Sequence, residues 1–311
     1  ATIDAALAPG LSARARASHF DNDQRLLFRL GDNRQRTWRY TGSLTQQLGS
    51  DGSLALTLFH HDSVFTTDNV GSPEGAPPNT VVFVQNRHRT PVRDFGSSLV
   101  WSQRFGGWLK ELTAGIDYHG IKGRDIADIF DESGARIRTD LGGGKQRFAG
   151  GFVQASLQPA EPLELLLSVR YQDFYNHSGF DFSPGGPGPV PARHDSDVDP
   201  RLSLRYAVSD GLALRTAAYR AFRAPTLDNL YRAFSIPGGI FLGNPQLRPE
   251  TLEGGEFGLD VTRPGLRLQV TAFANRLKNA LTFSPLSAGE LPTGFFFGSR
   301  IVNAARARSR G

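Results

Sequence analysis

Apolar and polar residues alternate along several stretches of this sequence, with a period of two residues. In residues 163–172, LELLLSVRYQ, apolar side chains occupy every second position from Leu163 to Tyr171, and mainly polar or charged side chains lie between them. Residues 37–48, 198–208 and 266–275 follow the same pattern. Because successive side chains of a β-strand point to opposite faces, the alternation predicts strands with one apolar and one polar face. Helical spacing fits none of these stretches.

Turn signals and longer polar segments also alternate along the chain. Short turns are indicated about 50–55 residues apart, at 50–53, 106–107, 159–162, 209–211 and 263–265. Long segments rich in Gly, Pro and Asp lie between them, at 67–91, 122–146, 176–197, 222–252 and 283–299. Short turns at one end and long loops at the other are typical of transmembrane barrels, whereas a sandwich distributes its loop lengths more evenly.

The fold class that follows is all-β, as a partial transmembrane antiparallel up-and-down β-barrel. Residues 37–311 are expected to form eleven strands, and residues 1–36 to add one or two more. The expected strands are 37–48, 54–66, 92–104, 109–121, 147–158, 163–175, 198–208, 212–221, 253–262, 266–282 and 300–311.

Composition excludes several function classes. The 311 residues contain no Cys, so disulfides, thiolate metal sites and a Cys nucleophile are impossible. No run approaches the roughly 20 apolar residues of a transmembrane helix, whereas barrel strands stay near neutral hydropathy. The net charge of +5 is spread along the whole chain rather than concentrated on one element. This distribution argues against nucleic-acid binding.

Two strings near the middle of the chain carry the most specific signal. RAFRAPTLDNLY spans residues 220–231, and GNPQLRPET spans 243–251 and leads into the alternating EGGEFGLDV. Together with the earlier hairpin at 146–174, their order and spacing resemble the barrel domain of the TonB-dependent outer-membrane receptors. The resemblance covers most of the chain from about residue 37.

This resemblance implies a function and a setting. It implies energy-coupled uptake of a scarce nutrient across the bacterial outer membrane, with a ferric siderophore or similar chelate as the first expectation. The implied partners are membrane lipid, the small-molecule substrate and the TonB complex, which would act through a plug domain outside this chain. A plugged barrel has about 22 strands, so we expect a segment of about 11–13 strands that ends before the closing strands. No enzymatic activity and no cofactor are expected.

Three sets of residues are candidates for named roles. Aromatic residues and one His in the expected extracellular loops could contact substrate, although an interfacial girdle or loop packing fits them better: Tyr175, His177, Phe180, Phe182, Tyr231, Phe234 and Phe241. Charged residues could face the lumen or the plug: Arg170, Arg201, Arg205, Arg215, Arg220, Arg223, Glu256 and Asp260. Motif residues are expected to be architectural: Pro225, Asn244, Pro245, Pro249 and Glu250.

Other interpretations remain open at this point. A passive porin or a surface-adhesion barrel would show the same strand pattern, and a soluble β-sandwich or propeller enzyme is a more distant alternative. The segment HDSDVD (194–199) is unlike a calcium loop, because Pro200 stands where Gly is required. Gly142 to Lys145 has the wrong spacing for a phosphate loop. No catalytic constellation is evident.

Overall fold

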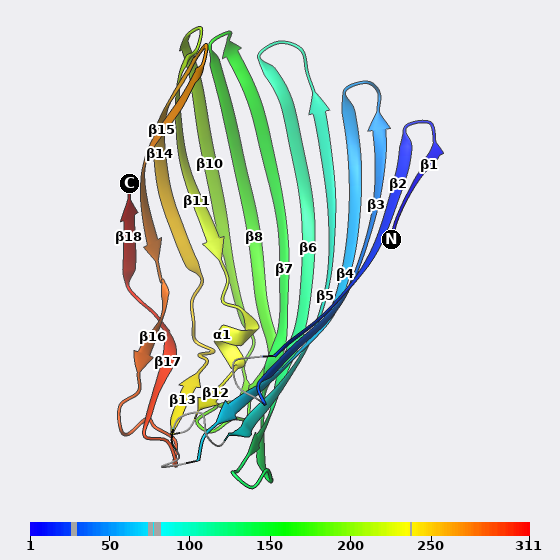
Figure 1. Cartoon of the computed structure of the whole chain (residues 1–311). Helices are drawn as coiled ribbons and strands as arrows, with labels where there is room; N and C mark the ends of the chain where they lie inside the picture. The colour runs from blue at the N-terminus through cyan, green and yellow to red at the C-terminus, as the bar shows by residue number, and fades with distance from the viewer. Residues whose placement is uncertain (26–29, 74–76, 78–81, 237) are drawn as a thin grey trace.

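A computed structural model describes residues 1–25, 30–73, 77, 82–236 and 238–311, and these residues are almost entirely β-strand (Figure 1). Over that part of the chain, fourteen strands form one large antiparallel sheet. Thirteen follow a single path: β1 (Thr2–Ala8), β2 (Leu11–Arg25), β3 (Asp32–Leu48), β4 (Gly52–Gly71), β5 (Phe83–Arg104), β6 (Leu109–Phe130), β7 (Arg136–Ala160), β8 (Leu163–Asp181), β10 (Arg193–Ser209), β11 (Leu212–Arg223), β14 (Glu250–Arg263), β15 (Leu266–Lys278) and β18 (Arg306–Arg310). The short β9 (Gly188–Val190) pairs with β8.

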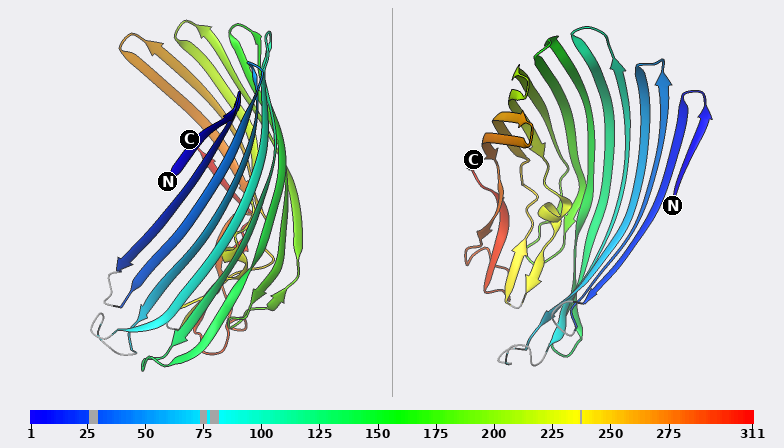
Figure 2. Two further views of the ribbon diagram at one scale, coloured as in Figure 1. Left: turned by 90° about the vertical axis from the view of Figure 1, so that its right-hand side faces the viewer. Right: turned by 45° about the horizontal axis from the view of Figure 1, so that its top comes forward.

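The large sheet is curved and twisted like part of a barrel wall (Figures 1 and 2). β1 and β18 lie at its two edges, and consecutive strands are neighbours. Tight turns join the strands at the upper end of Figure 1, where Gly211 (φ 82°) and Gly265 (φ 74°) adopt the left-handed conformation that Gly tolerates best. The longer connections lie at the opposite end, as the spacing of turn signals predicts.

The sheet has one apolar face and one polar face. Large apolar side chains are exposed at alternate positions on the outer face, among them Val169, Tyr171 and Leu202. The residues between them point to the concave, inner face, where Arg170 reaches Asp117. This arrangement is the predicted one, and it matches an outer surface for lipid and an inner surface for water.

A smaller sheet lies at the long-loop end (Figure 1). Its strand order is β12-β13-β17-β16, and β13 pairs with β17 in parallel. The bounds are β12 (Phe234–Ile236), β13 (Gly239–Leu242), β16 (Leu281–Pro285) and β17 (Phe297–Asn303). Helix α1 (Leu227–Tyr231) precedes β12, and Thr226 and Asn229 close its first turn with a reciprocal capping box. We find no helix in the described part of the chain with the length and hydropathy to span a bilayer.

The strands are longer than the sequence predicts. The segment 122–146, expected to be a loop, is mostly the paired end of β6 and β7, which are joined by a turn near 131–135. β8 likewise extends to Asp181, and the expected loop at 67–91 falls partly outside the described residues. The ladder hydrogen bonds of a neighbouring strand outweigh the turn preference of Gly and Asp, because β propensity depends on its context.

The final part of the chain also differs from the prediction. The expected strand 266–282 ends at Lys278, because Asn279 adopts a left-handed φ of 55° and turns the chain into β16. The expected strand 300–311 is divided into β17 and β18. Asn303 holds this junction by donating hydrogen bonds to the carbonyl oxygens of Arg248 (2.9 Å) and Asn279 (2.8 Å). Residues 1–36 contain β1, β2 and the start of β3.

Candidate functional site

The inner face of the wall carries a layer of paired charges. Arg170 donates two hydrogen bonds to Asp117, at 2.7 and 2.8 Å, and crosses over Gly150 to reach it. A Cβ on Gly150 would lie 2.5 Å from the Arg170 guanidinium, so Gly there leaves the space that this crossing requires. Arg215 lies over Gly258 in the same way. Glycines within the strands are therefore crossing points for long inner side chains.

The other predicted inner residues make similar contacts. Arg205 pairs with Glu164 at 3.2 Å and Arg215 pairs with Asp260 at 3.0 Å. Glu256 accepts a hydrogen bond from the hydroxyl of Tyr219 at 3.0 Å. Because directly opposed residues of an antiparallel pair share a face, Arg201 lies on the same face as Tyr219, its partner across the ladder. These residues line a polar, hydrated surface.

Arg220 lies where β11 separates from its neighbour β10. The ladder between β10 and β11 begins at Arg201 and Tyr219 and does not extend past Pro200, which has no N–H to donate. The end of β11 separates from β10 there, and Arg220 contacts the Asp197 carboxylate at 2.7 Å and the Val198 carbonyl at 3.0 Å.

Four candidate substrate contacts lie on the outer face. Tyr175 and His177 stack at 5.1 Å on β8, on the same face as Tyr171. Phe180 opposes Gly143 on this face, and Phe182 stacks on it at 5.8 Å. His177 and Phe180 were expected in the segment 176–197 and lie in a strand, because the ladder with β7 continues to Asp181. Their placement favours the girdle interpretation.

Tyr231 is 2% exposed and fills a notch in the inner face. The notch consists of Gly142, Gly144 and Gly179 on β7 and β8. A Cβ on Gly179 would lie 2.6 Å from the Tyr231 ring, and one on Gly144 would lie 2.9 Å from it. Burial raises the pKa of the Tyr231 phenol, and Arg193 partly opposes this. The sequence predicts an exposed loop aromatic here, whereas the structure has a buried anchor.

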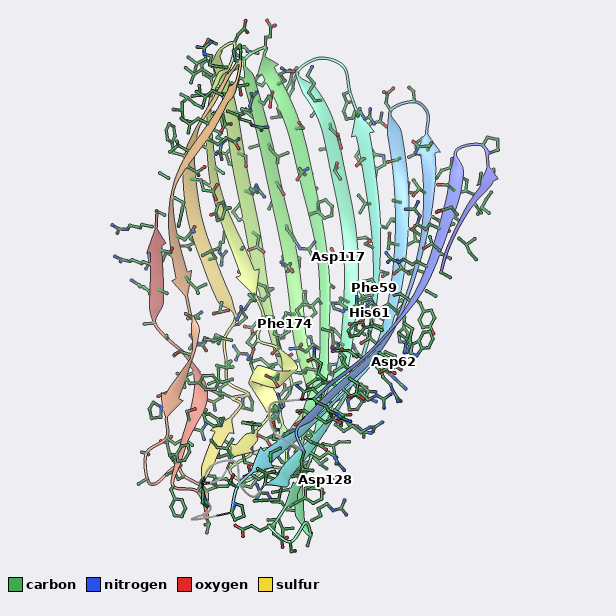
Figure 3. The ribbon with its side chains drawn as sticks, in the orientation of Figure 1. Phe59, His61, Asp62, Asp117, Asp128 and Phe174 are labelled. Carbon is green, nitrogen blue, oxygen red and sulfur yellow. The ribbon has the colours of Figure 1, made fainter. Side chains whose placement is uncertain are left out.

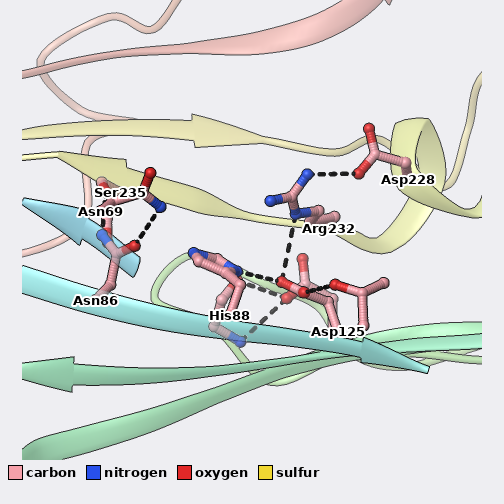
Figure 4. Close-up of polar contacts among 10 residues, drawn as sticks. Asn69, Asn86, His88, Asp125, Asp228, Arg232 and Ser235 are labelled. Atoms are coloured by element: carbon pink, nitrogen blue, oxygen red, sulfur yellow. Dashed lines mark hydrogen bonds and ion pairs between the residues drawn. The ribbon is translucent and has the colours of Figure 1, made fainter. Parts of the chain in front are cut away.

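A buried polar network surrounds the next residue (Figure 4). Arg232 Nε lies 3.3 Å from Asp125 on β6, and Asp125 also contacts His88 Nδ1 at 2.7 Å. Asn86 donates to the Ser235 carbonyl at 2.9 Å. Burial lowers the pKa of the Arg232 guanidinium. The carboxylates of Asp125 and Asp228 raise it by more, so the net change is upwards. No local sequence pattern predicts this network, because its members are far apart along the chain.

Aromatic side chains gather at the long-loop end. Phe241 contacts Phe234 at 6.1 Å and Phe283 edge-on at 6.2 Å. Phe296 is 86% exposed, and Phe283 and Phe297 are also exposed. The mouth cluster, defined as Phe234, Phe241, Phe283, Phe296 and Phe297, contains two predicted residues and three that we did not predict. The run Phe295 to Phe297, flanked by Gly, is the signal that could have found the last two.

A row of rings crosses the inner face between the mouth cluster and the short turns, and Figure 3 labels two of its members, Phe59 and Phe174. Phe59 contacts His119 at 5.4 Å, His119 contacts Phe148 at 6.0 Å, Phe148 contacts Phe174 at 5.0 Å, and Phe174 contacts Phe222 at 6.4 Å. These residues come from five strands, so sequence spacing alone does not bring them together.

The motif residues contact other parts of the chain. The Pro225 carbonyl accepts a hydrogen bond from Gln146 at 2.8 Å, and Asn244 donates to the Ile301 carbonyl at 3.0 Å. Asn244 and Leu247 close the turn that contains Pro245. The Pro249 carbonyl accepts from Asn279 at 3.1 Å. The Glu250 carboxylate pairs with Arg223 at 2.6 Å and accepts from the Leu281 amide at 2.9 Å.

Within the described residues, no group of His, Asp and Glu could hold a metal ion.

Comparisons with known proteins give one consistent family. The family model described as TonB dependent receptor-like, beta-barrel matches residues 3–311. Vitamin B12 transporter BtuB of Vibrio vulnificus (strain YJ016) is 30% identical over 103 residues, which are 33% of this chain and 15% of that protein. Copper transporter OprC has a TM-score of 0.78 at 15% identity, over 100% of this chain and 48% of that chain. The ferric enterobactin receptor PfeA from Pseudomonas aeruginosa has a TM-score of 0.66 at 17% identity, over 100% of this chain and 47% of that chain.

The predicted family, fold class and location are confirmed. The chain spans about half the length of these two structures. The named relatives are transporters and receptors rather than enzymes, as expected. A family match over nearly the whole chain, an antiparallel barrel wall and the apolar outer face agree with one another. The chain belongs to the TonB-dependent receptor family, as part of a β-barrel domain of the outer membrane of Gram-negative bacteria.

Proposed function

We propose that this chain forms wall and mouth of a receptor that takes up a scarce nutrient, with a ferric siderophore or similar chelate as the substrate class. The family match over residues 3–311 is the observation that carries this proposal. Solved relatives include a ferric enterobactin receptor and the alcaligin receptor FauA, and others are named for copper and vitamin B12. A metal chelate is the class that these names have most in common.

The charged inner face supports a hydrated passage. Its ion pairs, such as Arg170–Asp117 and Arg205–Glu164, are partly or largely exposed. Exposed pairs contribute only about 0–1 kcal/mol each, so stability alone does not account for a whole layer of them. A polar inner surface instead suits a barrel whose interior holds water, a plug and a passing solute.

The mouth cluster suits capture of the substrate. Phe283 on β16, Phe297 at the start of β17 and the preceding Phe296 are exposed at the long-loop end of the wall. Arg138 lies 5.8 Å from the ring of Phe295, and Arg300 lies three residues after Phe297 on β17, where it pairs with Glu290 at 3.6 Å. Aromatic faces and guanidinium groups together bind planar, anionic ligands through stacking and charge. We therefore propose the mouth cluster, including the predicted Phe234 and Phe241, as the first contact for a chelate.

Energy coupling completes the proposal. The TonB complex would act on a plug domain inside the barrel, and this chain would supply the surrounding wall. A passive porin or an adhesion barrel with the same wall would need no energy source. Proton-motive force therefore separates the proposed function from these alternatives.

Uptake by cells tests both parts. The gene that encodes this chain, in its full reading frame, would be expressed in a strain without other receptors. Accumulation of ferric enterobactin, cobalamin and Cu(II) would be measured with and without a protonophore. We expect one of these compounds to accumulate and the protonophore to abolish it. Accumulation that the protonophore leaves unchanged would identify a passive pore.

Ligand binding tests the mouth cluster separately. Replacing Phe296 and Phe297 by Ala is expected to weaken binding of the accepted compound at least tenfold, since each stacked ring contributes about 1 kcal/mol. Phe257→Ala is the matched control, because Phe257 is 56% exposed but lies on the outer face of β14. If the double variant and the control bound the compound with equal affinity, the mouth cluster would not be part of the binding site.

A further inference from the structure

The connection between β11 and β14 lies inside the wall. We call residues 224–236 and 238–249 the flap. Its helix α1 contacts β7 and β8, and Asn86 on β5 and Asp125 on β6 bind the residues that follow the helix. Figure 1 shows α1 and β12 on the concave side of the sheet. The flap therefore crosses the inner face of four strands at the long-loop end.

An aromatic anchor holds the flap against the wall. Tyr231 fills the glycine notch, and its backbone approaches equally closely: a Cβ on Gly142 would lie 2.0 Å from the Tyr231 carbonyl oxygen. Real Cβ atoms do not come so near to a backbone atom, so even one methyl group at Gly142 is incompatible with docking. The fit depends on the absence of side chains at three wall positions, and this makes it specific to the docked position.

A charged anchor lies beside it. Arg232 binds Asp125, whose carboxylate is also bound by His88 and by the hydroxyl of Thr90 at 2.6 Å. Asp125 and His88 are 7% and 1% exposed, and the buried Nε2 of His88 has no hydrogen-bond partner in the described part of the chain. Water can replace every one of these contacts on release, and interfaces that open are typically polar in this way.

The flap has a well-buried core of its own at Leu230 and Leu247, but it leaves one cavity against the wall and has a hinge. A cavity of about 240 Å³ remains between α1 and the wall, lined by Val92, Ile121 and Leu227 among others. Unfilled space means that fewer contacts are lost when the two surfaces separate. The ladder that would hold β11 to β10 stops after Tyr219, whereas Arg223 and Glu250 keep the two ends of the flap paired with each other. Because β13 pairs with β17 and Asn244 binds the Ile301 carbonyl, the flap can move about the end of β11 only together with β16 and β17.

We propose that the flap is a latch with two states. In the docked state, Tyr231 and Arg232 hold it across the inner face and narrow the passage at the mouth. In the released state, both residues leave the wall and the passage widens. The inference depends on the contacts of the flap and not on which compound is transported.

Amide hydrogen exchange, read by mass spectrometry, tests the latch in the protein expressed from the full reading frame and reconstituted in lipid bilayers. The wild-type chain is expected to show slow exchange over 226–232, with two resolved populations for the two states. Gly142→Ala is expected to raise exchange over 226–232 at least tenfold, while β3 and β4 keep their protection. Gly151→Ala is the matched control, because it lies on the same strand and its Cβ would meet no atom closer than 3.5 Å.

Two results would overturn the proposal. Wild-type exchange over 226–232 as fast as in an unstructured peptide would mean that the flap does not dock. Slow exchange with a single population, unchanged by Gly142→Ala, would mean a fixed element rather than a latch. If Gly142→Ala fails to fold, Arg232→Gln is the second variant: it removes only the charged anchor and should raise the released fraction, whereas an unchanged fraction would contradict the two-anchor account.

Discussion

Phe174 gives the sharpest test of how the wall is held together. It is 1% exposed, on the inner face of β8, and packs between Phe148 of β7 and Phe222 of β11. A buried Phe removes roughly 150–250 Å² from water, which at about 25 cal/mol per Å² corresponds to roughly 4–6 kcal/mol. Phe→Ala substitutions in cores cost about 3–5 kcal/mol. We therefore expect Phe174→Ala to lower the free energy of unfolding by about 4 kcal/mol.

The assay is urea unfolding of the protein expressed from the full reading frame and reconstituted in lipid vesicles, followed by tryptophan fluorescence. Phe257→Ala serves as the comparison, because Phe257 lies on the outer face of β14 and is 56% exposed. Lipid tails fill the space that the missing ring leaves, so this loss carries the transfer cost of about 1.5–3 kcal/mol but no cavity cost, and it should be smaller than that of Phe174→Ala. Equal losses in the two variants would refute the assignment of inner and outer faces.

Three further substitutions test single features of the wall. A double-mutant cycle over Arg170→Met and Asp117→Asn should give a coupling of about 1 kcal/mol in unfolding measurements, falling as salt rises. Gly211→Ala should destabilise by about 1–3 kcal/mol, because its Cβ would lie 2.1 Å from the Thr262 carbonyl, whereas Gly265→Ala, with open space around it, should cost only about 1 kcal/mol. Pro200→Ala restores a ladder donor and should slow hydrogen exchange at the end of β11; faster exchange would contradict its role in dividing the wall.

The fold could be predicted because apolar and polar residues alternate with a period of two along the strands of the wall. The alternation from Leu163 to Tyr171 identifies the outer face without any tertiary information. The same rule places Arg170 and Arg205 on the inner face, and the structure gives both an acidic partner there. Strand ends were harder, because pairing with a neighbouring strand extends β7 through residues whose own preference is for turns.

The site was predictable only where it depends on this alternation. Gly142 and Gly144 indicate a loop when only the sequence is considered, but they are strand residues that make room for Tyr231. Their function depends on a side chain about 90 positions later, so no local pattern reveals it. Phe180 was a candidate for substrate contact, yet its strand turns it outwards. Contacts of this kind are set by topology, which a single sequence does not encode locally.

One irregularity in β8 bears on how such a wall can change over evolutionary time. Ser178 adopts a left-handed φ of 53°, and the ladder with β7 shifts by one residue at this point. Asn176 before it and Asp181 after it therefore both face inwards, although they are an odd number of positions apart. Elsewhere in a strand, a single inserted or deleted codon would exchange the lipid side and the water side of everything beyond it. A bulge accommodates one extra or missing residue without exchanging the two faces. Strands can therefore change length at a bulge while their apolar side chains still face lipid and their polar side chains still face water.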